Sequence, residues 1–192
     1  FKMTKIIASE VNKLRKQTGA GMMDCKNALI EAKGDFELAI DVLRKKGQKI
    51  ALKRSDRTAS EGVVLAGISE DKQFGAIISV NCETDFVAKN EDFISFSKSV
   101  LNIVIKEKIN SKELLQNLSL DGVSVSEKLL EKTGVIGEKI ELGFFDCINA
   151  KFVTAYIHHG NRLASLVGLN IFNQDYLELG KNLCMQVAAM NP

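Results

Sequence analysis

The sequence lacks the features that mark several large classes of protein. Of its 192 residues, 26 are lysine or arginine and 24 are aspartate or glutamate, so the formal net charge is only +2. This balance gives no global field for nucleic acid or an anionic membrane. No apolar run approaches the roughly 20 residues that span a bilayer, and no signal-peptide layout begins the chain. We therefore expect a cytoplasmic protein with neither DNA nor a membrane among its partners.

The cysteines and histidines are also too few and too scattered for a metal site. Cys25, Cys82, Cys147 and Cys184 are far apart, and none belongs to a C-x-x-C pair of the kind that zinc sites and small disulfide scaffolds use. The chain contains no recognisable Ser-His-Asp set and no dinucleotide fingerprint. We expect buried cytosolic thiols, no metal, no cofactor and no catalytic residues. A small hydrolase is disfavoured, and binding without covalent chemistry is predicted.

Hydrophobic residues make up 45% of the chain, which is enough for a core. Over residues 4–47 they recur every three or four positions, which is the period of amphipathic helices. Glycines separate three such stripes, at Gly19 and Gly34 among others. Because the connections are so short, we expect a compact three-helix bundle. A basic tail follows it, so the first domain is predicted to cover residues 1–55.

Beyond Glu61 the apolar residues change to the two-residue period of strands. A first hairpin is predicted at 62–82. It is followed by a helix with Phe93 and Phe96 on its apolar face, and then by a short helix that ends at Gly134. We expect Phe96 in particular to lie in the core.

Strands and a helix then occur in the same order a second time. A strand, a hairpin across the Gly160-Asn161 turn and a closing helix at 176–187 complete the chain. The predicted fold class is therefore α+β. After the bundle comes a core of two related subdomains, at 56–136 and 137–192, and in each a helix covers one face of an antiparallel sheet.

The segment at 18–23, T-G-A-G-M-M, is glycine-rich but follows a helix and lacks the Lys-Ser/Thr of a phosphate-binding loop. Met22 and Met23 stand at a helix start and cannot both point into one core. One of them is therefore expected to be exposed, and flexible methionine suits a contact surface. The alternative is that both are half-buried and fill gaps.

The segment at 81–87, N-C-E-T-D-F-V, lies where a predicted strand ends and a helix begins. Thr84 or Asp85 is suited to cap that helix, and Phe86 falls in its first turn. Periodicity alone favours a ring of Phe86 that folds back as a hydrophobic staple. The alternative is an aromatic anchor, held outward for insertion into a pocket of a partner.

Two further groups of polar residues favour surfaces over chemistry. His158 and His159 end a strand and have no third ligand beside them, which favours a contact surface. A basic cluster lies near the end of the bundle, without interleaved aromatic residues, so a solvated face is favoured over RNA phosphates. An RNA-binding translation or replication subunit is the runner-up hypothesis. The cluster consists of Arg44, Lys45, Lys46, Lys49, Lys53, Arg54 and Arg57.

Two long segments resemble the signatures of one family. L-R-K-Q-T-G-A-G-M-M-D-C-K-N-A-L at 14–29 and V-N-C-E-T-D-F-V-A-K-N at 80–90 are similar to signatures of elongation factor Ts, a bacterial-type translation factor. A looser match includes Tyr156, His158 and Arg162. The chain is identified as a member of this family, and the resemblance covers almost all of its length.

The family resemblance implies a function in translation elongation. Members are guanine-nucleotide exchange factors that bind elongation factor Tu, both GDP-bound and nucleotide-free. Their T-D-F segment enters the G domain and disturbs the site of the nucleotide's Mg²⁺, so that GDP leaves and GTP can bind. The implied fold is an N-terminal three-helix module similar to ubiquitin-associated domains, followed by two related α+β subdomains.

The resemblance also implies which residues bind elongation factor Tu. The T-D-F segment and the T-G-A-G-M-M segment are assigned to the G domain. The histidine pair is assigned to another domain, with the second histidine in reserve because the family's spacing varies here. The implied set is Arg15, Met22, Met23, Thr84, Asp85, Phe86, Val87, His158 and His159. Members of this layout continue past Met-Asn-Pro into a helical hairpin and a final helix, so we expect both to be missing, and homodimer formation stays open.

Overall fold

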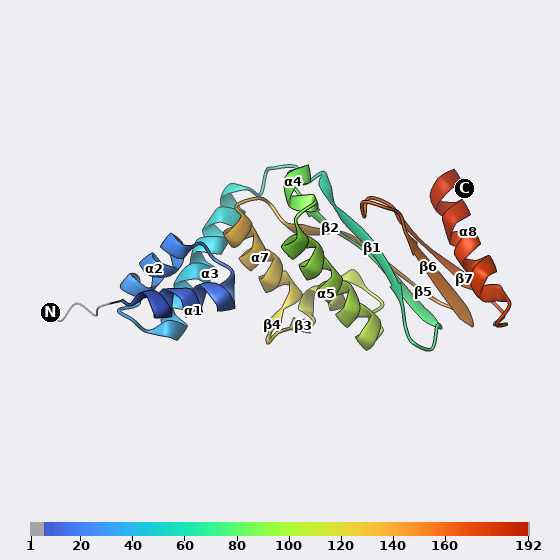
Figure 1. The fold of residues 1–192 in the computed structure, drawn as a ribbon, viewed down its shortest axis with the longest axis horizontal. Coiled ribbons are helices and arrows are strands. Elements are labelled where there is room, and N and C mark those ends of the chain that lie inside the picture. The colour runs from blue at the N-terminus through green and yellow to red at the C-terminus, as the bar shows by residue number, and fades with distance from the viewer. Residues whose placement is uncertain (1–5, 192) are drawn as a thin grey trace. The chain divides into compact units, whose positions relative to one another are not determined.

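The computed structural model of the chain describes residues 6–191. Helices and antiparallel sheets make up the fold (Figure 1), which confirms the predicted α+β class. The described chain divides into two compact units. The first contains the residues up to Arg57 together with Glu127–Lys139, and the second contains the remainder.

The first unit begins with the predicted helices, α1 (Ala8–Thr18), α2 (Met22–Glu31) and α3 (Phe36–Lys53). Thr4, near which the helical pattern starts, lies outside the described residues. The apolar stripes face one another and form a small core in which Leu14 is fully buried. The three-helix arrangement expected from periodicity is therefore confirmed.

Local capping explains where these helices begin and end. Gly19 takes a left-handed conformation (φ 72°) after α1, and its N–H donates to the carbonyl of Arg15 at 2.8 Å. Asp35 caps α3 by accepting a hydrogen bond from the N–H of Leu38 at 3.0 Å. Both are cap types that sequence can reveal, because the interactions span only three or four residues.

A later helix, α7 (Val125–Ile136), contributes most of its length to the first unit. It approaches α3 at two glycines, where a Cβ on Gly134 would lie 2.5 Å from the Cα of Gly47. Arg44 also forms an ion pair with Glu131, with Nε and Oε1 3.7 Å apart. The predicted domain bounds placed this helix in the first α+β subdomain, because its pattern does not indicate which surface it covers.

The second unit is organised around a three-stranded antiparallel sheet in the order β1-β2-β5. Its strands are β1 (Glu61–Ile68), β2 (Phe74–Cys82) and β5 (Glu141–Asn149). The first two form the predicted hairpin. The helix α5 (Glu91–Glu107) packs on the sheet, and Phe96 on its apolar face is buried as expected.

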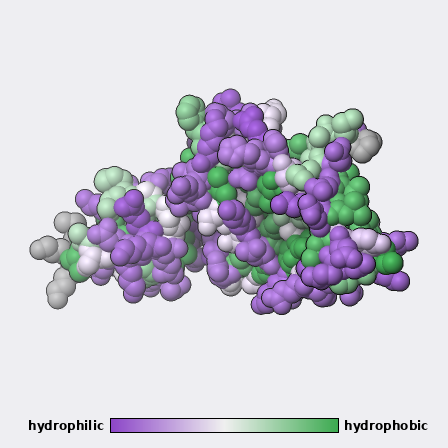
Figure 2. Space-filling view, turned by 45° about the vertical axis from the view of Figure 1, so that its right-hand side comes forward, coloured by the Kyte–Doolittle hydropathy of each residue, from purple (hydrophilic) through white to green (hydrophobic). Residues whose placement is uncertain are grey.

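A second hairpin consists of β6 (Phe152–Ile157) and β7 (Ala164–Leu169), and α8 (Tyr176–Met190) packs on it. Helix and strand approach closely at Gly180, whose carbonyl accepts a hydrogen bond from Thr154 Oγ1 at 3.0 Å. Apolar surface is visible on this unit (Figure 2). Its exposed large hydrophobic residues include Ile171, Phe172, Leu179 and Met190. Short elements complete the chain: α4 (Asp85–Ala88), α6 (Lys112–Asn117), β3 (Ser119–Leu120) and β4 (Val123–Ser124).

The structure divides the core differently from the predicted bounds of 56–136 and 137–192. β5 pairs along its length with β2, from Asn81 opposite Glu141 to Phe74 opposite Asn149. It therefore completes the first sheet and does not join the second hairpin. An alternating pattern identifies a strand but leaves its pairing partner open, because every half-buried strand shares the same period.

Candidate partner-binding site

The T-D-F segment forms α4, a single helical turn between β2 and α5. Thr84 is its N-cap, and its hydroxyl accepts a hydrogen bond from the N–H of Val87 at 3.5 Å. Just before it, the buried thiol of Cys82 lies 3.2 Å from the carbonyl oxygen of Thr84 and donates to it. The turn is therefore fixed at the end of a sheet strand, and Thr84 is the cap, as one of the two predicted alternatives states.

The ring of Phe86 is left in solvent. Its side chain is 83% exposed, the largest value among the large hydrophobic residues that the structure describes. A hydrophobic staple would bury the ring against a neighbouring helix residue, so the interpretation that periodicity favoured is wrong. Full burial of such a ring stabilises by about 1.5–3 kcal/mol, and this fold leaves that contribution unused.

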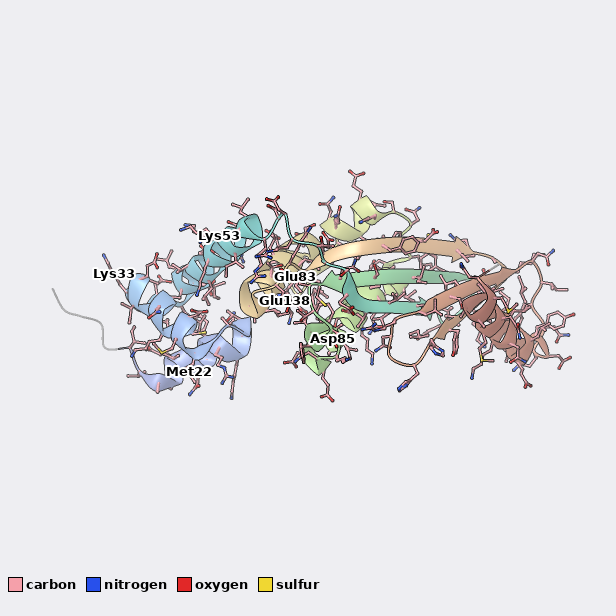
Figure 3. The ribbon with its side chains drawn as sticks, turned by 90° about the horizontal axis from the view of Figure 1, so that it is seen from above. Met22, Lys33, Lys53, Glu83, Asp85 and Glu138 are labelled. Carbon is pink, nitrogen blue, oxygen red and sulfur yellow. The ribbon has the colours of Figure 1, made fainter. Side chains whose placement is uncertain are left out.

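Asp85, the residue before Phe86, begins α4 (Figure 3) and has a charged partner on the same turn of chain. Its Oδ2 accepts a hydrogen bond from Lys89 Nζ at 2.6 Å. This hydrogen bond and the charge of Lys89, followed by the charge of Arg162, hold the pKa of the Asp85 carboxyl below its ordinary value. Asp85 is therefore a carboxylate at neutral pH, paired with Lys89 and adjacent in sequence to the exposed ring.

The predicted histidine pair lies in the turn between β6 and β7 of the same unit. His158 and His159 are both exposed. The hydroxyl of Tyr156 forms a hydrogen bond with His158 Nδ1 at 2.8 Å, which orients that ring. The turn is attached to the sheet, because the carbonyl of Asn161 accepts a hydrogen bond from the N–H of Val64 at 2.7 Å.

The remaining predicted residues belong to the first unit. Met22 and Met23 begin α2, with 45% and 62% of their surfaces exposed, and Arg15 is exposed on α1. Both methionines are therefore on the surface, where only one was expected. The interpretation that both are half-buried fillers is wrong for Met23, whereas Met22 is about half-buried. Two flexible apolar side chains in water at a helix start form a surface suited to a partner.

Sequence reasoning quoted Lys89 and Arg162 within the family motifs but did not connect them with Asp85. Lys89 follows it by four positions, the spacing at which helical side chains meet, so this pair could have been found. The ion pair between Arg162 Nη2 and Glu61 Oε2, 2.7 Å apart, has no local signal because the two residues are far apart in sequence. Only the fold brings them together.

The basic cluster is partly neutralised by acidic partners. Arg44 forms ion pairs with Asp41 at 3.3 Å and with Glu131, and Lys46 Nζ lies 2.5 Å from Asp24 Oδ1. Paired cations attract phosphate less than free ones do. This arrangement favours the predicted solvated face over an RNA-binding surface.

The thiols and histidines of the described chain form no metal centre. Over residues 6–191, no three His, Cys, Asp or Glu side chains gather in a way that could hold an ion. Cys25, Cys82 and Cys184 are buried, whereas Cys147 is partly exposed. Burial raises the pKa of the Cys25 and Cys147 thiols. None of the helices between these limits has the length and apolar character of a membrane span.

Comparison with known proteins reveals the family. The family model of elongation factor TS matches residues 83–192, which include α4 and the turn between β6 and β7. Elongation factor Ts of Christiangramia forsetii is 56% identical over 190 residues, which is 99% of this chain and 69% of that protein. The chain belongs to the elongation factor Ts family.

Other members of the elongation factor Ts family agree over the same length. The protein of Flavobacterium psychrophilum is 47% identical over 190 residues, covering 99% of this chain and 69% of the relative. That of Flavobacterium johnsoniae is 49% identical over 188 residues, covering 98% of this chain and 58% of the relative. These matches include α1 to α3, which the family model does not. They support a role in translation elongation.

Proposed function

We propose that this chain is a guanine-nucleotide exchange factor for elongation factor Tu. It binds the GDP-bound GTPase, disturbs its Mg²⁺ and phosphate site, and promotes GDP release so that GTP can bind. The observation that carries the proposal is Phe86, an 83% exposed ring on a capped turn in a member of this family. No covalent step is required of the chain.

The exposed ring supplies binding free energy that the free protein does not use. Because the cap at Thr84 and the sheet fix the turn, Phe86 loses little conformational freedom when it enters a pocket. Asp85 carries its negative charge to the same place. A carboxylate near a bound phosphate is repelled, so the partner holds this turn and its nucleotide together only in a strained complex.

Exchange then follows from linkage between two ligands of one GTPase. If the factor weakens GDP binding by some ratio, GDP weakens binding of the factor by the same ratio. The strained ternary complex lies between two stable binary ones, so either ligand can leave from it. The factor therefore accelerates release in both directions, and the excess of GTP determines which nucleotide is bound at the end.

The other predicted residues extend this contact. We assign Arg15, Met22 and Met23 to the G domain of elongation factor Tu, and His158 to another of its domains, with His159 in reserve. Arg15 supplies a charge, and the two exposed methionines supply adaptable apolar surface. Thr84 and Val87 hold the shape of the turn that presents the ring.

The test is the release of a fluorescent GDP analogue from elongation factor Tu. The wild-type chain is expected to accelerate release, and Phe86→Ala to reduce the acceleration roughly tenfold or more, as for a hot-spot residue. Phe144→Ala is the matched control, because Phe144 is a 51% exposed phenylalanine on β5 of the same unit. The melting temperatures of both variants should stay near that of wild type.

Two outcomes contradict the proposal. If the wild-type chain leaves the release rate unchanged while it binds the GTPase, the chain does not act as an exchange factor. If Phe86→Ala and Phe144→Ala reduce the acceleration equally, the ring of Phe86 has no special part in exchange.

A further inference from the structure

The turn between β6 and β7 is attached to the edge of the first sheet by two hydrogen bonds. Arg162 Nη2 donates to Glu61 Oε2 at the start of β1, 2.7 Å away. Beside it, the Asn161 carbonyl accepts from the N–H of Val64, also at 2.7 Å. β1 is an edge strand of its sheet, so its outer N–H groups are open to such a partner.

The same ion pair lies next to the turn that carries Phe86. Glu61 is opposite Cys82 in the ladder between β1 and β2, and the chain reaches Asp85 three residues after Cys82. After the contribution of Lys89, the charge of Arg162 also lowers the pKa of the Asp85 carboxyl. The guanidinium therefore contacts the sheet edge, and its charge also acts on the acidic residue of α4.

The pair is accessible to solvent, which limits its contribution to stability. The side chain of Arg162 is 60% exposed and that of Glu61 is 32% exposed. Exposed ion pairs contribute little to folding. Its position is more informative than its strength, because it joins the two separate hairpins whose ends carry the predicted contact residues.

We propose that Arg162 is a positioning residue of the exchange surface, which holds the β6–β7 turn with His158 in a fixed place relative to Asp85 and Phe86 on α4. This inference rests on the function proposed above. Two contacts strengthen binding to one partner only when the distance between them matches the distance between their two sites on that partner. A turn that is free to move must be ordered on binding, which weakens the complex.

The role predicts a specific pattern in a double-mutant cycle of Glu61→Ala and Arg162→Ala. If Arg162 acts through Glu61, each single variant raises the half-saturating concentration of the chain in the GDP-release assay by roughly two- to fivefold. The double variant is then no worse than either single one. The maximal release rate changes little, because α4 keeps its cap and its ring. Arg162→Lys, which keeps the charge and a donor, recovers part of the loss.

A third substitution provides a readout that loss of stability does not produce. His158→Ala is expected to raise the half-saturating concentration by a larger factor in wild type than in the Arg162→Ala background. The reason is that the histidine can bind the partner well only when its turn is held in place. If His158→Ala raises the half-saturating concentration by the same factor in both backgrounds, the inference is overturned. It is also overturned if Arg162→Ala matches wild type, or if Arg162→Ala weakens binding while Glu61→Ala does not, since that result describes a direct contact with the partner.

The wild-type chain separates this inference from the proposed function. If wild type accelerates GDP release and the Arg162 variants behave like wild type, the positioning role is contradicted and the proposed function is not. No acceleration by wild type contradicts the proposed function, and the positioning role fails with it. Melting curves of each variant identify any that are unfolded, and for these the milder Arg162→Lys and a Glu61→Gln partner replace the alanine variants in the same cycle.

Discussion

At the scale of single residues, the turn at α4 combines Thr84, which stabilises it, with Phe86, which the fold of this protein does not need. Thr84 caps the turn through the N–H of Val87, whereas Phe86 leaves a large apolar surface in water. A ring of this size normally contributes to a core. Its exposure on a fixed turn therefore supports the proposed contact with a partner.

A carboxylate in the hairpin turn between β1 and β2 has a different role, which is structural. Asp71 accepts hydrogen bonds from Lys108 Nζ at 2.6 Å, from Ser69 Oγ at 2.5 Å and from the Gln73 N–H at 3.1 Å. In that order, these bonds hold the pKa of its carboxyl far below the ordinary value of 3.8. The folded state thus binds the Asp71 proton more weakly than the unfolded state does.

The expected consequence is a pH-dependent contribution to stability. With its pKa lowered, Asp71 stabilises the fold above pH 3.8, and this contribution is lost as the pH falls below that value. Asp71→Asn should therefore melt below wild type at about pH 7, and the difference should shrink as the pH falls toward about 3. Thermal melts across this range are the measurement. A difference that stays constant with pH would show that the lost stability does not come from the carboxylate charge.

At the scale of elements, α5 supports the sheet that ends in α4. Its apolar face is buried against β1 and β2, with Phe93, Val100 and Val104 at most 1% exposed. Asn90 caps its start by accepting from the N–H groups of two following residues. The helix therefore fixes the strand end from which the proposed contact turn projects.

Truncation in this helix is expected to be costly. Phe96 is 8% exposed within the apolar face of α5, so Phe96→Ala should reduce the free energy of unfolding by about 3–5 kcal/mol. Lys98→Ala, at an exposed position of the same helix, is the control and should change it by less than about 0.5 kcal/mol. Urea unfolding of both variants measures the difference. Equal stabilities would show that the ring of Phe96 is not part of the core.

At the scale of the whole molecule, the chain passes from the first unit into the second, back into the first, and finally into the second again. It leaves the second unit after Ser126, adds α7 to the helices of the first, and re-enters the second at Ile140. Each unit thus depends on segments that are far apart in sequence. The stability of the N-terminal helices should therefore depend on residues in the middle of the chain.

The glycine contact between α3 and α7 provides the test. A Cβ at Gly134 would lie 2.5 Å from the Gly47 Cα, so Gly134→Ala forces the two helices apart. Overpacking of this kind costs about 1–3 kcal/mol, against a gain in helix propensity of at most about 1 kcal/mol. We expect a lower melting temperature than wild type, whereas Lys45→Ala, at an exposed position on α3, should melt like wild type. A Gly134→Ala variant that melts at or above wild type would contradict the close approach.

Local interactions explain what could be predicted from the sequence alone. The three N-terminal helices, the two hairpins, α5 and the cap at Thr84 all depend on residues within a few positions of one another, and their periods and cap residues are visible in the sequence. The family signatures are also continuous segments. They predict that the T-D-F turn and the two methionines contact a partner, and a looser match adds the histidine pair; these assignments stay predictions.

Tertiary structure alone determined the rest. The pairing of β5 with β2, the place of α7 beside α3, the exposure of Phe86 and the ion pair of Arg162 with Glu61 depend on segments that meet only in the fold. A periodic pattern states that a face is apolar but not what covers it. Those outcomes are set by the complementarity of distant surfaces and by the neighbours that a side chain does or does not find.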